Sequence, residues 1–427
     1  KFLIKKIRNL SSKKIFKDIV ALGTSNILLQ PIQLLKSFVV IKVLGPEIYG
    51  SLKSVEMLQM LDKYGNLGFN ATARREIGHA RGLKDVEYEK VVRNNTYSGE
   101  IILATILFLL GILFSFSFSK DFIWIIIFAS FSLFFSKIRN ILSTEASIQK
   151  NFLLISKTRV FSTIISIGFI FIFISSIKIY AVLIGNGLLG LIATIYLFKK
   201  LKFDYEFKID FSKMKKLLSI SIPLTFNTLA LGSYKYSERI LVLTLLGQKN
   251  LGFYSFAVTI GTIISTLLKT AITVRVQDLY ELLGEKKYKN VNKIVLYETL
   301  LLLIASIGLI FIFWLLLDFL VPRFLPKWSD SIIYAKALLF IILAELMSIH
   351  PSYVLISTLV NKVKIVSLLR LISSIVLCSL TYIISYVSSL DLLSFIYVNI
   401  ISYFLYSLSI MVYYYFYFYR IYVAKNS

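Results

Sequence analysis

The stretch from Ile294 to Leu317, IVLYETLLLLIASIGLIFIFWLLL, decides the class of fold. An α-helix rises 1.5 Å per residue, so about 20 mostly apolar residues are needed to cross roughly 30 Å of hydrocarbon. This stretch is long and apolar enough to do so, and we expect it to form a transmembrane helix.

Similar apolar stretches recur along the whole chain, which has 427 residues, 57% of them hydrophobic. Together they predict twelve spans, near residues 18–41, 51–73, 97–119, 122–142, 160–177, 179–198, 217–244, 251–274, 294–317, 332–356, 365–387 and 391–419. The chain is therefore predicted to be an all-α, polytopic membrane protein. No cleavable signal is expected, because the first apolar run is too long and lacks a small-residue cleavage site.

The composition excludes several other classes of protein. Only 17% of the residues are charged, which argues against a disordered chain and against an ordinary cytosolic enzyme. Cys378 is the single cysteine, so the chain has no internal disulfide. The net charge of +25 would suggest nucleic acid as a partner of a soluble protein. Here its meaning depends on where the basic residues fall relative to the spans.

The basic residues fall almost entirely on one side of the predicted spans. With the N-terminus in the cytoplasm, the inner side holds 33 of the 48 Lys and Arg residues, and the outer connections hold five. Cytoplasmic loops of membrane proteins are enriched in Lys and Arg, so this bias predicts that both termini are cytoplasmic. We interpret the charge as a topology signal and a contact with anionic lipid headgroups of the inner (cytoplasmic) membrane, not as a nucleic-acid site.

The chain also carries an internal duplication. Residues 43–50 read VLGPEIYG and lie between the first two spans, and residues 245–252 read LLGQKNLG and lie between spans seven and eight. The spacing is 202 residues, and both glycines and a leucine coincide. Glycines suit a tight turn that needs positive φ. We therefore expect these glycines to form turns at equivalent places in two halves of the molecule.

Six spans in each half mean that the two halves cross the membrane in the same sense, related by an axis along the membrane normal. Two such six-helix bundles enclose a cavity between them, which is typical of a transporter. The predicted organisation is a basic cytoplasmic N-terminus (1–17), an N-terminal bundle (18–198), a cytoplasmic linker (199–216), a C-terminal bundle (217–419) and a cytoplasmic tail (420–427).

Several short motifs carry a resemblance to a known family. They are LGPEIYG at 44–50, NLGF at 66–69, RREI at 74–77, SERI at 237–240 and LGFYSFA at 251–257. With the span count, they make the chain similar to Wzx-type polysaccharide flippases, which handle O-antigen or capsule repeat units. These belong to the multidrug/oligosaccharidyl-lipid/polysaccharide (MOP) exporter superfamily, with the MATE and MviN-like proteins. The resemblance implies that polyprenyl-diphosphate-linked oligosaccharides are moved from the inner to the outer leaflet.

Ten basic residues remain inside the predicted spans. Each could cost about 2.5–3.5 kcal/mol at the centre of a lipid-facing helix, so most must reach the interface, form an ion pair or face water. Lys42 and Lys53 lie near the outer turn, and we expect them to reach the interface. The same is expected of Lys137 and Arg139, which approach the inner end of span four.

The remaining charges coincide with polar stripes on the first two spans. Gln33 and Ser37 repeat at helical spacing beside Lys36, and the 202-residue offset places Gln33 opposite Lys235 and Lys36 opposite Glu238. We hypothesise a hydrated, basic cavity that binds a diphosphate and polar or anionic sugars, because Arg and Lys both bind phosphate. Ion pairs that hold the bundles together, such as Lys36–Glu238 or Asp62–Lys63, are the alternative. The candidate cavity residues are Gln33, Lys36, Glu56, Asp62, Lys63, Lys235, Glu238, Arg239 and Lys269.

The sequence leaves open whether protons, sodium ions or the substrate gradient drives transport. Glu345 and His350 lie in span ten beside Pro351, and they could exchange protons or form a buried structural hydrogen bond. Glu56, Asp62 and Glu145 are further possible cation sites. No cofactor is expected beyond a coupling H⁺ or Na⁺, and the His and Cys residues show no metal-binding spacing.

Enzymatic functions find little support. The sequence has no glycine-rich phosphate loop and no Gly-x-Ser-x-Gly motif, and its outer loops are too short for a catalytic domain. A membrane glycosyltransferase or polysaccharide polymerase is therefore the weaker alternative. A cation-coupled drug antiporter of the same superfamily is the closer one. We predict a monomeric flippase that works by alternating access, with a lipid-linked oligosaccharide and the bilayer as partners, alongside polymerase and glycosyltransferases. The sequence does not name the sugar.

Overall fold

A computed structural model describes residues 29–57, 59–60, 67–117, 120–356, 362–387 and 389–423. Every regular element in these ranges is a helix, so the predicted all-α class is confirmed. The chain divides into two compact units. The described part of unit 1 comprises residues 29–44 and 55–225, and that of unit 2 comprises residues 45–54 and 226–423.

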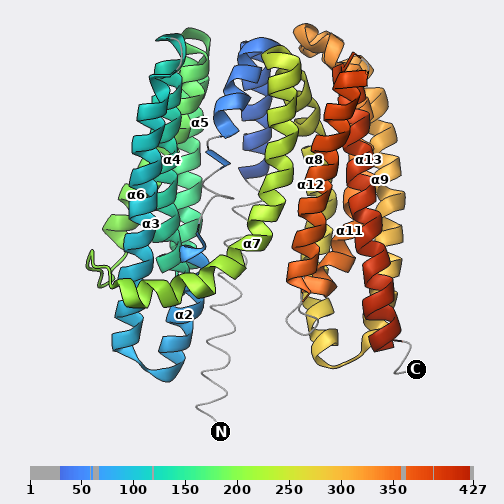
Figure 1. Ribbon diagram of the computed structural model, residues 1–427. Coiled ribbons are helices and arrows are strands. Elements are labelled where there is room, and N and C mark those ends of the chain that lie inside the picture. The colour runs from blue at the N-terminus through green and yellow to red at the C-terminus, as the bar shows by residue number, and fades with distance from the viewer. Residues whose placement is uncertain are drawn as a thin grey trace. The chain divides into compact units, whose positions relative to one another are not determined.

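Unit 1 consists of long helices that pack side by side (Figure 1). Helix α4 packs on α3 and α6, α5 packs on α6, and α2 packs on α3 and α4. The first part of α7 also belongs to this unit, and it runs crosswise to α3 (Figure 1). The bounds are α2 (Phe69–Leu83), α3 (Val86–Ser115), α4 (Lys120–Ile148), α5 (Phe152–Ile177), α6 (Ile179–Lys200) and α7 (Phe211–Leu241).

The basic connections on the predicted inner side are largely helical, which differs from the loops expected there. Residues 74–93 form most of α2 and the start of α3, separated by a turn at Lys84, whose φ is 60°. Helix α8 likewise continues to Gly284, within the predicted loop at 275–293. The length of an apolar run reflects only the hydrocarbon thickness. The helix itself can continue beyond the hydrocarbon until a capping or helix-breaking residue ends it.

Several helices begin after an Asp or Asn residue, as capping chemistry predicts. The side chains of Asp85, Asn151 and Asp391 accept hydrogen bonds from backbone N–H groups of α3, α5 and α13. The backbone N–H of Ser394 donates to Oδ1 of Asp391 at 2.9 Å. These caps satisfy N–H groups that helix starts leave without an intrahelical partner.

The extended segment 201–210 connects α6 to α7 and is bound along α3. The Oδ1 atom of Asn94 accepts from the backbone N–H of Glu206 at 3.1 Å, and that of Asn95 accepts from Asp210 at 2.8 Å. The whole predicted linker, residues 199–216, therefore lies within unit 1. Helix α7 passes from unit 1 to unit 2 between Thr225 and Phe226, two residues after Pro223.

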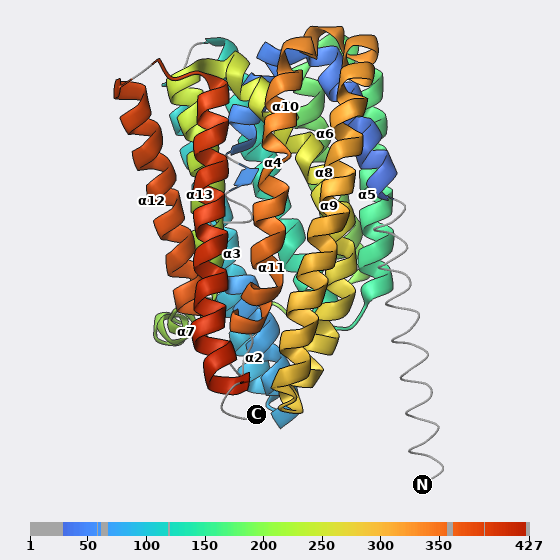
Figure 2. The ribbon, with the colours of Figure 1, turned by 90° about the vertical axis from the view of Figure 1, so that its right-hand side faces the viewer.

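Unit 2 contains the remaining helices, of which α9, α11, α12 and α13 run side by side in Figure 2. Helix α13 packs on α10, α11 and α12, and α8 packs on α9, α10 and α11. Predicted span ten is interrupted at residues 339–340, between α10 and α11. The bounds are η1 (Val242–Leu246), α8 (Gly247–Gly284), α9 (Tyr288–Phe324), η2 (Pro326–Ser331), α10 (Ile332–Leu338), α11 (Ile341–Ile356), α12 (Val363–Val387), α13 (Leu392–Tyr413) and η3 (Tyr414–Val423).

The two copies of the duplicated motif meet within unit 2, and their glycines serve two different purposes. Gly45 and Gly247 have φ values of 71° and 85°, so the predicted turns are present there. Gly50 and Gly252 do not have positive φ. A Cβ atom on Gly50 would lie 1.9 Å from the Gln248 carbonyl oxygen, and one on Gly252 would lie 2.0 Å from the Pro46 carbonyl oxygen. The second glycine of each copy therefore permits close backbone contact, which corrects the expected turn role.

The outward faces of many helices are apolar, as a lipid-facing surface requires. Ile172, Ile304 and Phe311 are examples, with 71%, 63% and 61% of their side-chain surface exposed. Eight described helical segments are long and apolar enough to cross a membrane. They coincide with predicted spans three to six and nine to twelve. The described residues of the other four predicted spans are helical, except for Leu67 and Gly68, which interrupt predicted span two.

Candidate functional site

A pocket of unit 2 brings together two basic residues and three tyrosines. It encloses about 20 Å³, which is room for roughly one water molecule. Lys235 comes from α7 and Arg370 comes from α12, so two helices far apart in the sequence supply its positive charge. The lining residues are Leu231, Tyr234, Lys235, Arg370, Ser373, Tyr403 and Tyr406.

Arg370 is held in place by an aromatic neighbour. Its Nε atom donates to the Tyr406 hydroxyl at 2.9 Å, and its guanidinium carbon lies 5.9 Å from the centre of the same ring. Arg370 is not among the predicted cavity residues, although it lies within the predicted span at 365–387, which the structure shows as α12. A signal for its position exists, because Ser367, Arg370 and Ser374 form a polar stripe at helical spacing.

A buried polar chain lies next to this pocket. The Tyr234 hydroxyl donates to Oδ1 of Asn399 at 2.7 Å, and Nδ2 of Asn399 donates to the Tyr254 hydroxyl at 2.9 Å. The predicted site residue Glu238 lies beside the Tyr254 hydroxyl and the Asn399 amide. Among the predicted residues of α7, it is therefore Lys235 that lines the pocket, while Glu238 contacts the neighbouring polar chain.

Unit 1 contains a larger, polar pocket of about 240 Å³. Lys36 adjoins it, because its Nζ atom donates to Oδ1 of Asn186 at 2.9 Å. Arg139 lines the pocket and donates from Nη2 to Ser136 Oγ at 2.9 Å, so it does not only extend toward the interface as expected. The lining residues are Gln59, Ser132, Leu133, Ser136, Arg139, Asn186 and Leu189.

The other predicted cavity residues do not line either pocket where the structure describes them. Gln33 is exposed, and Glu56 and Arg239 are half-buried. The remaining predicted cavity residues lie outside the described part of the chain: they are Asp62, Lys63 and the side chain of Lys269. The described residues thus bring Lys36 and Lys235, two of the predicted cations, to pockets in separate units.

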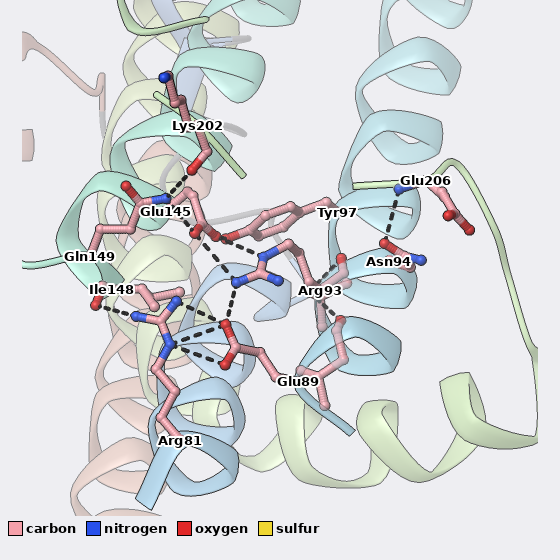
Figure 3. A network of polar contacts seen from close by, with 12 residues as sticks. Arg81, Glu89, Arg93, Asn94, Tyr97, Glu145, Ile148, Gln149, Lys202 and Glu206 are labelled. Carbon is pink, nitrogen blue, oxygen red and sulfur yellow. Dashed lines mark hydrogen bonds and ion pairs between the residues drawn. The ribbon is translucent and has the colours of Figure 1, made fainter. Parts of the chain in front are cut away.

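Buried ion pairs accommodate other charges within unit 1. Lys137 is fully buried, and its Nζ atom lies 3.1 Å from Oε1 of Glu100, so it pairs inside the helix bundle and does not reach the interface as expected. Arg93 pairs with Glu145, from Nε to Oε2 at 3.1 Å (Figure 3). The Tyr97 hydroxyl donates to the same Oε2 atom at 2.7 Å.

This network continues along the polar ends of α2, α3 and α4 (Figure 3). Gln149 donates to Oε1 of Glu145 at 2.9 Å and also to the backbone oxygen of Lys202, which joins the linker to α4. Glu89 contacts both Arg93 and Arg81. Several donors surround Glu145, so its surroundings are those of a structural carboxylate and not of an open cation site.

The two predicted coupling residues contact different partners. Glu345 accepts from Ser265 Oγ at 2.8 Å. The Nε2 atom of His350 lies 3.3 Å from Oε2 of Glu298 on α9, and its Nδ1 atom lies 3.4 Å from the Thr299 hydroxyl. Within the described residues, no group of three or more His, Cys, Asp or Glu side chains could hold a metal ion.

Comparison with known families identifies a match over more than half of the chain. The profile of a family described as "Polysaccharide biosynthesis protein" matches residues 15–276, which are 262 of the 427 residues. No curated protein matches the chain significantly.

Solved structures with the same fold are transporters. An inward-facing multidrug resistance MATE family transporter of the MOP superfamily has a TM-score of 0.72 and 13% identity, over 96% of this chain and 99% of that one. An outward-facing structure of such a transporter has a TM-score of 0.65 and 14% identity, over 93% and 94%. A MOP superfamily transporter from Pyrococcus furiosus, described as having a binding pocket of reverse polarity, has a TM-score of 0.62 and 14% identity, over 93% and 94%. At these identities, the likeness supports the fold alone.

Proposed function

Because the chain belongs to the polysaccharide biosynthesis protein family and has the fold of a MOP superfamily membrane transporter, we propose that it is a flippase for lipid-linked oligosaccharides. Its substrate would be a polyprenyl diphosphate that carries an oligosaccharide repeat unit. Such a molecule has an apolar tail that stays in lipid, and a charged, polar head that cannot cross the hydrocarbon unaided. The transporter supplies a polar path for the head.

The pocket of unit 2 is the observation that carries this proposal. A guanidinium group binds phosphate oxygens through two parallel N–H donors, and an ammonium group acts as a compact point charge. Arg370 and Lys235 provide one of each in the same pocket. Because the pocket encloses only about 20 Å³, it would have to open before a sugar ring could enter beside the tyrosines. The amides and hydroxyls of the unit 1 pocket suit sugar hydroxyls.

Transport would follow an alternating-access cycle. The similar MATE fold is known in inward-facing and outward-facing forms, and we propose that this chain also alternates between two such states. The headgroup would bind from the cytoplasmic side of the inner membrane and leave on the outer side. The chain would act as a monomer and not as an enzyme, handing the glycan from glycosyltransferases to a polymerase.

A drug antiporter is the second candidate, because the structures of similar fold include multidrug transporters. Multidrug substrates that are cationic would be repelled by Lys235 and Arg370, which line the unit 2 pocket. An anionic headgroup would be attracted by the same two residues. The charge of the pocket therefore favours the flippase.

The test is flipping of a fluorescent oligosaccharide on a short polyprenyl diphosphate in proteoliposomes. We expect K235Q and R370Q each to reduce the initial rate by about tenfold or more, because a hydrogen bond to a charged group contributes about 1.5–3 kcal/mol. K249Q and R323Q are matched controls in the same unit, since both side chains are exposed and lie outside the pocket. Unchanged flipping by both pocket variants would contradict the proposal, and so would efflux of a cationic dye with no movement of the glycan.

A further inference from the structure

His350 is a fully buried histidine in unit 2, and a carboxylate lies beside it. Its exposed fraction is 0%, and that of the Glu298 side chain is 17%. The Nε2 atom lies 3.3 Å from Oε2 of Glu298, but it makes no hydrogen bond within the described residues. The Nδ1 atom lies 3.4 Å from the hydroxyl of Thr299, the residue next to Glu298. Buried polar atoms without a hydrogen bond are rare and call for an explanation.

A bound proton would explain this arrangement. When the ring is neutral with its hydrogen on Nδ1, the lone pair of Nε2 faces the carboxylate, and both groups are acceptors. A proton at Nε2 turns this approach into a charge-assisted N–H···O contact. It also changes the net charge of the pair from −1 to 0. An uncompensated charge is costly in an apolar interior. The protonated, neutral pair is therefore the form that is favoured when the surrounding helices exclude water.

Other ionisable groups around α11 are engaged elsewhere or are far weaker acids. Helix α11 packs against α8, α9, α12, α13 and η3. On α11 itself, Glu345 accepts from Ser265 of α8. Among the neighbouring helices, α9 contributes Glu298, and α12 contributes Arg370, which is bonded to Tyr406 of α13. Tyr403 of α13 and Tyr414 of η3 are further ionisable groups. The side chains of residues 267, 269–278, 280 and 281 on α8 lie outside the described part. Glu298 is the acidic group that the described residues place next to His350.

Glu298 of this pair lies on α9, the helix that follows the turn at residues 285–287 on the basic, predicted cytoplasmic side of the protein. Glu298 follows Tyr288, the first residue of α9, by ten positions, which corresponds to about 15 Å along the helix. Residues 285–287, before that helix, form the turn that the distribution of Lys and Arg assigns to the cytoplasm. The pair therefore lies about 15 Å along α9 from the turn that is predicted to be cytoplasmic.

We propose that His350 and Glu298 together form a proton-binding site, and that proton binding there couples glycan transport to a transmembrane pH gradient. The coupling rests on the proposed flippase function, whereas the proton site can be tested without any glycan. Sequence reasoning had paired His350 with Glu345, and the structure replaces that partner with Glu298.

The proton site is tested by nuclear magnetic resonance of nitrogen-15-labelled histidine in the full-length protein. The chain has only two histidines, so H79Q leaves His350 as its sole imidazole, provided that the purification tag contains none. We expect the ring to titrate between about pH 4 and about pH 8. Adding E298Q should lower the midpoint by about one pH unit or more, because a nearby carboxylate stabilises the imidazolium. Adding E345Q, the matched carboxylate control, should leave the midpoint unchanged.

Coupling is tested by flipping in proteoliposomes with and without an imposed pH gradient. We expect the gradient to accelerate flipping by the unaltered protein and by H79Q and E345Q, and this acceleration to be lost in H350Q and E298Q. If both variants retain the acceleration, or if the imidazole stays neutral throughout the titration, the inference is wrong. A normal titration with no flipping by the unaltered protein under any gradient would instead refute the flippase function and its coupling, and leave the proton site standing.

Discussion

Arg93 and Glu145 form a charged pair in the interior of unit 1, with relative side-chain exposures of 7% and 0%. Taking two charges out of water is costly, and the cost is offset only when both are well paired and hydrogen-bonded. Glu145 meets this condition through Arg93, Tyr97 and Gln149 (Figure 3). At the scale of single residues, pairing of this kind accounts for charges that a lipid-facing helix could not carry.

We therefore predict that E145Q destabilises the protein strongly. The substitution removes the carboxylate but leaves the guanidinium of Arg93 buried, and breaking a buried pair in this way costs about 3–5 kcal/mol. Glu89 still contacts Arg93, so the lower end of this range is expected. The measurement is the fraction of folded, monodisperse protein that remains after heating in detergent.

Two further variants sharpen this test. Replacing both partners, as R93M/E145M, should retain more folded protein than E145Q, because no uncompensated charge remains. K90Q, in the exposed pair of Lys90 with Glu206, should unfold like the unaltered protein. If E145Q were as stable as K90Q, the buried pair would not have the structural role that we assign to it.

At the scale of helices, the duplicated motif makes a tight crossing in unit 2. Its two segments approach so closely that the Gly50 and Gly252 positions have no room for a Cβ atom. The contact also includes a hydrogen bond from Ser51 Oγ to Oε1 of Gln248, at 3.2 Å. Small residues permit such close backbone approach between membrane helices, where burial of apolar surface supplies no driving force.

We predict that G252A disrupts this crossing. The added methyl group would lie 2.0 Å from the Pro46 carbonyl oxygen, so the backbone of one segment must move, and overpacking of this kind costs about 1–3 kcal/mol or more. G308A is the matched control in α9, because a Cβ atom there meets nothing within 4 Å. We expect thermal unfolding in detergent to show a lower midpoint for G252A and an unchanged or higher one for G308A, since alanine favours helix. Equal midpoints for the two variants would contradict the close contact.

At the scale of the whole molecule, the distribution of basic residues predicts which ends of the helices face the cytoplasm. Lys249 lies in the first turn of α8, and the segment between α8 and α9 contains Lys287. Both side chains are exposed, and α8 separates them along the chain. They should therefore be accessible from opposite sides of the membrane, with Lys249 outside and Lys287 inside.

Cysteine labelling in intact cells tests this orientation. In a C378S background, K249C should react with a membrane-impermeant maleimide added outside, and K287C should react only after the cells are permeabilised. Each variant removes one lysine, so the two are matched in charge. The reverse pattern of labelling would invert the topology, and with it the direction of the proposed transport.

Much of the architecture could be predicted from the chain alone. Long apolar stretches predicted helices because the hydrocarbon thickness sets a length that the sequence displays directly. The glycine turns at Gly45 and Gly247 were predicted from the repeat, since positive φ is a local property of one residue. Lys36 and Lys235 were singled out by their place within apolar spans, where a charge requires a reason.

The rest depended on which residues meet, and that only the tertiary structure decided. Arg370 and Lys235 are 135 positions apart in the sequence, yet they line the same pocket. Lys137 and Glu100 are 37 positions apart, yet they form an ion pair. Glu298 became the neighbour of His350 through the packing of α9 on α11. A sequence shows helical periodicity, length and charge, because these are properties of neighbouring residues. Partners brought together by the packing of distant helices leave no such local pattern, and their distances exist only in the folded molecule.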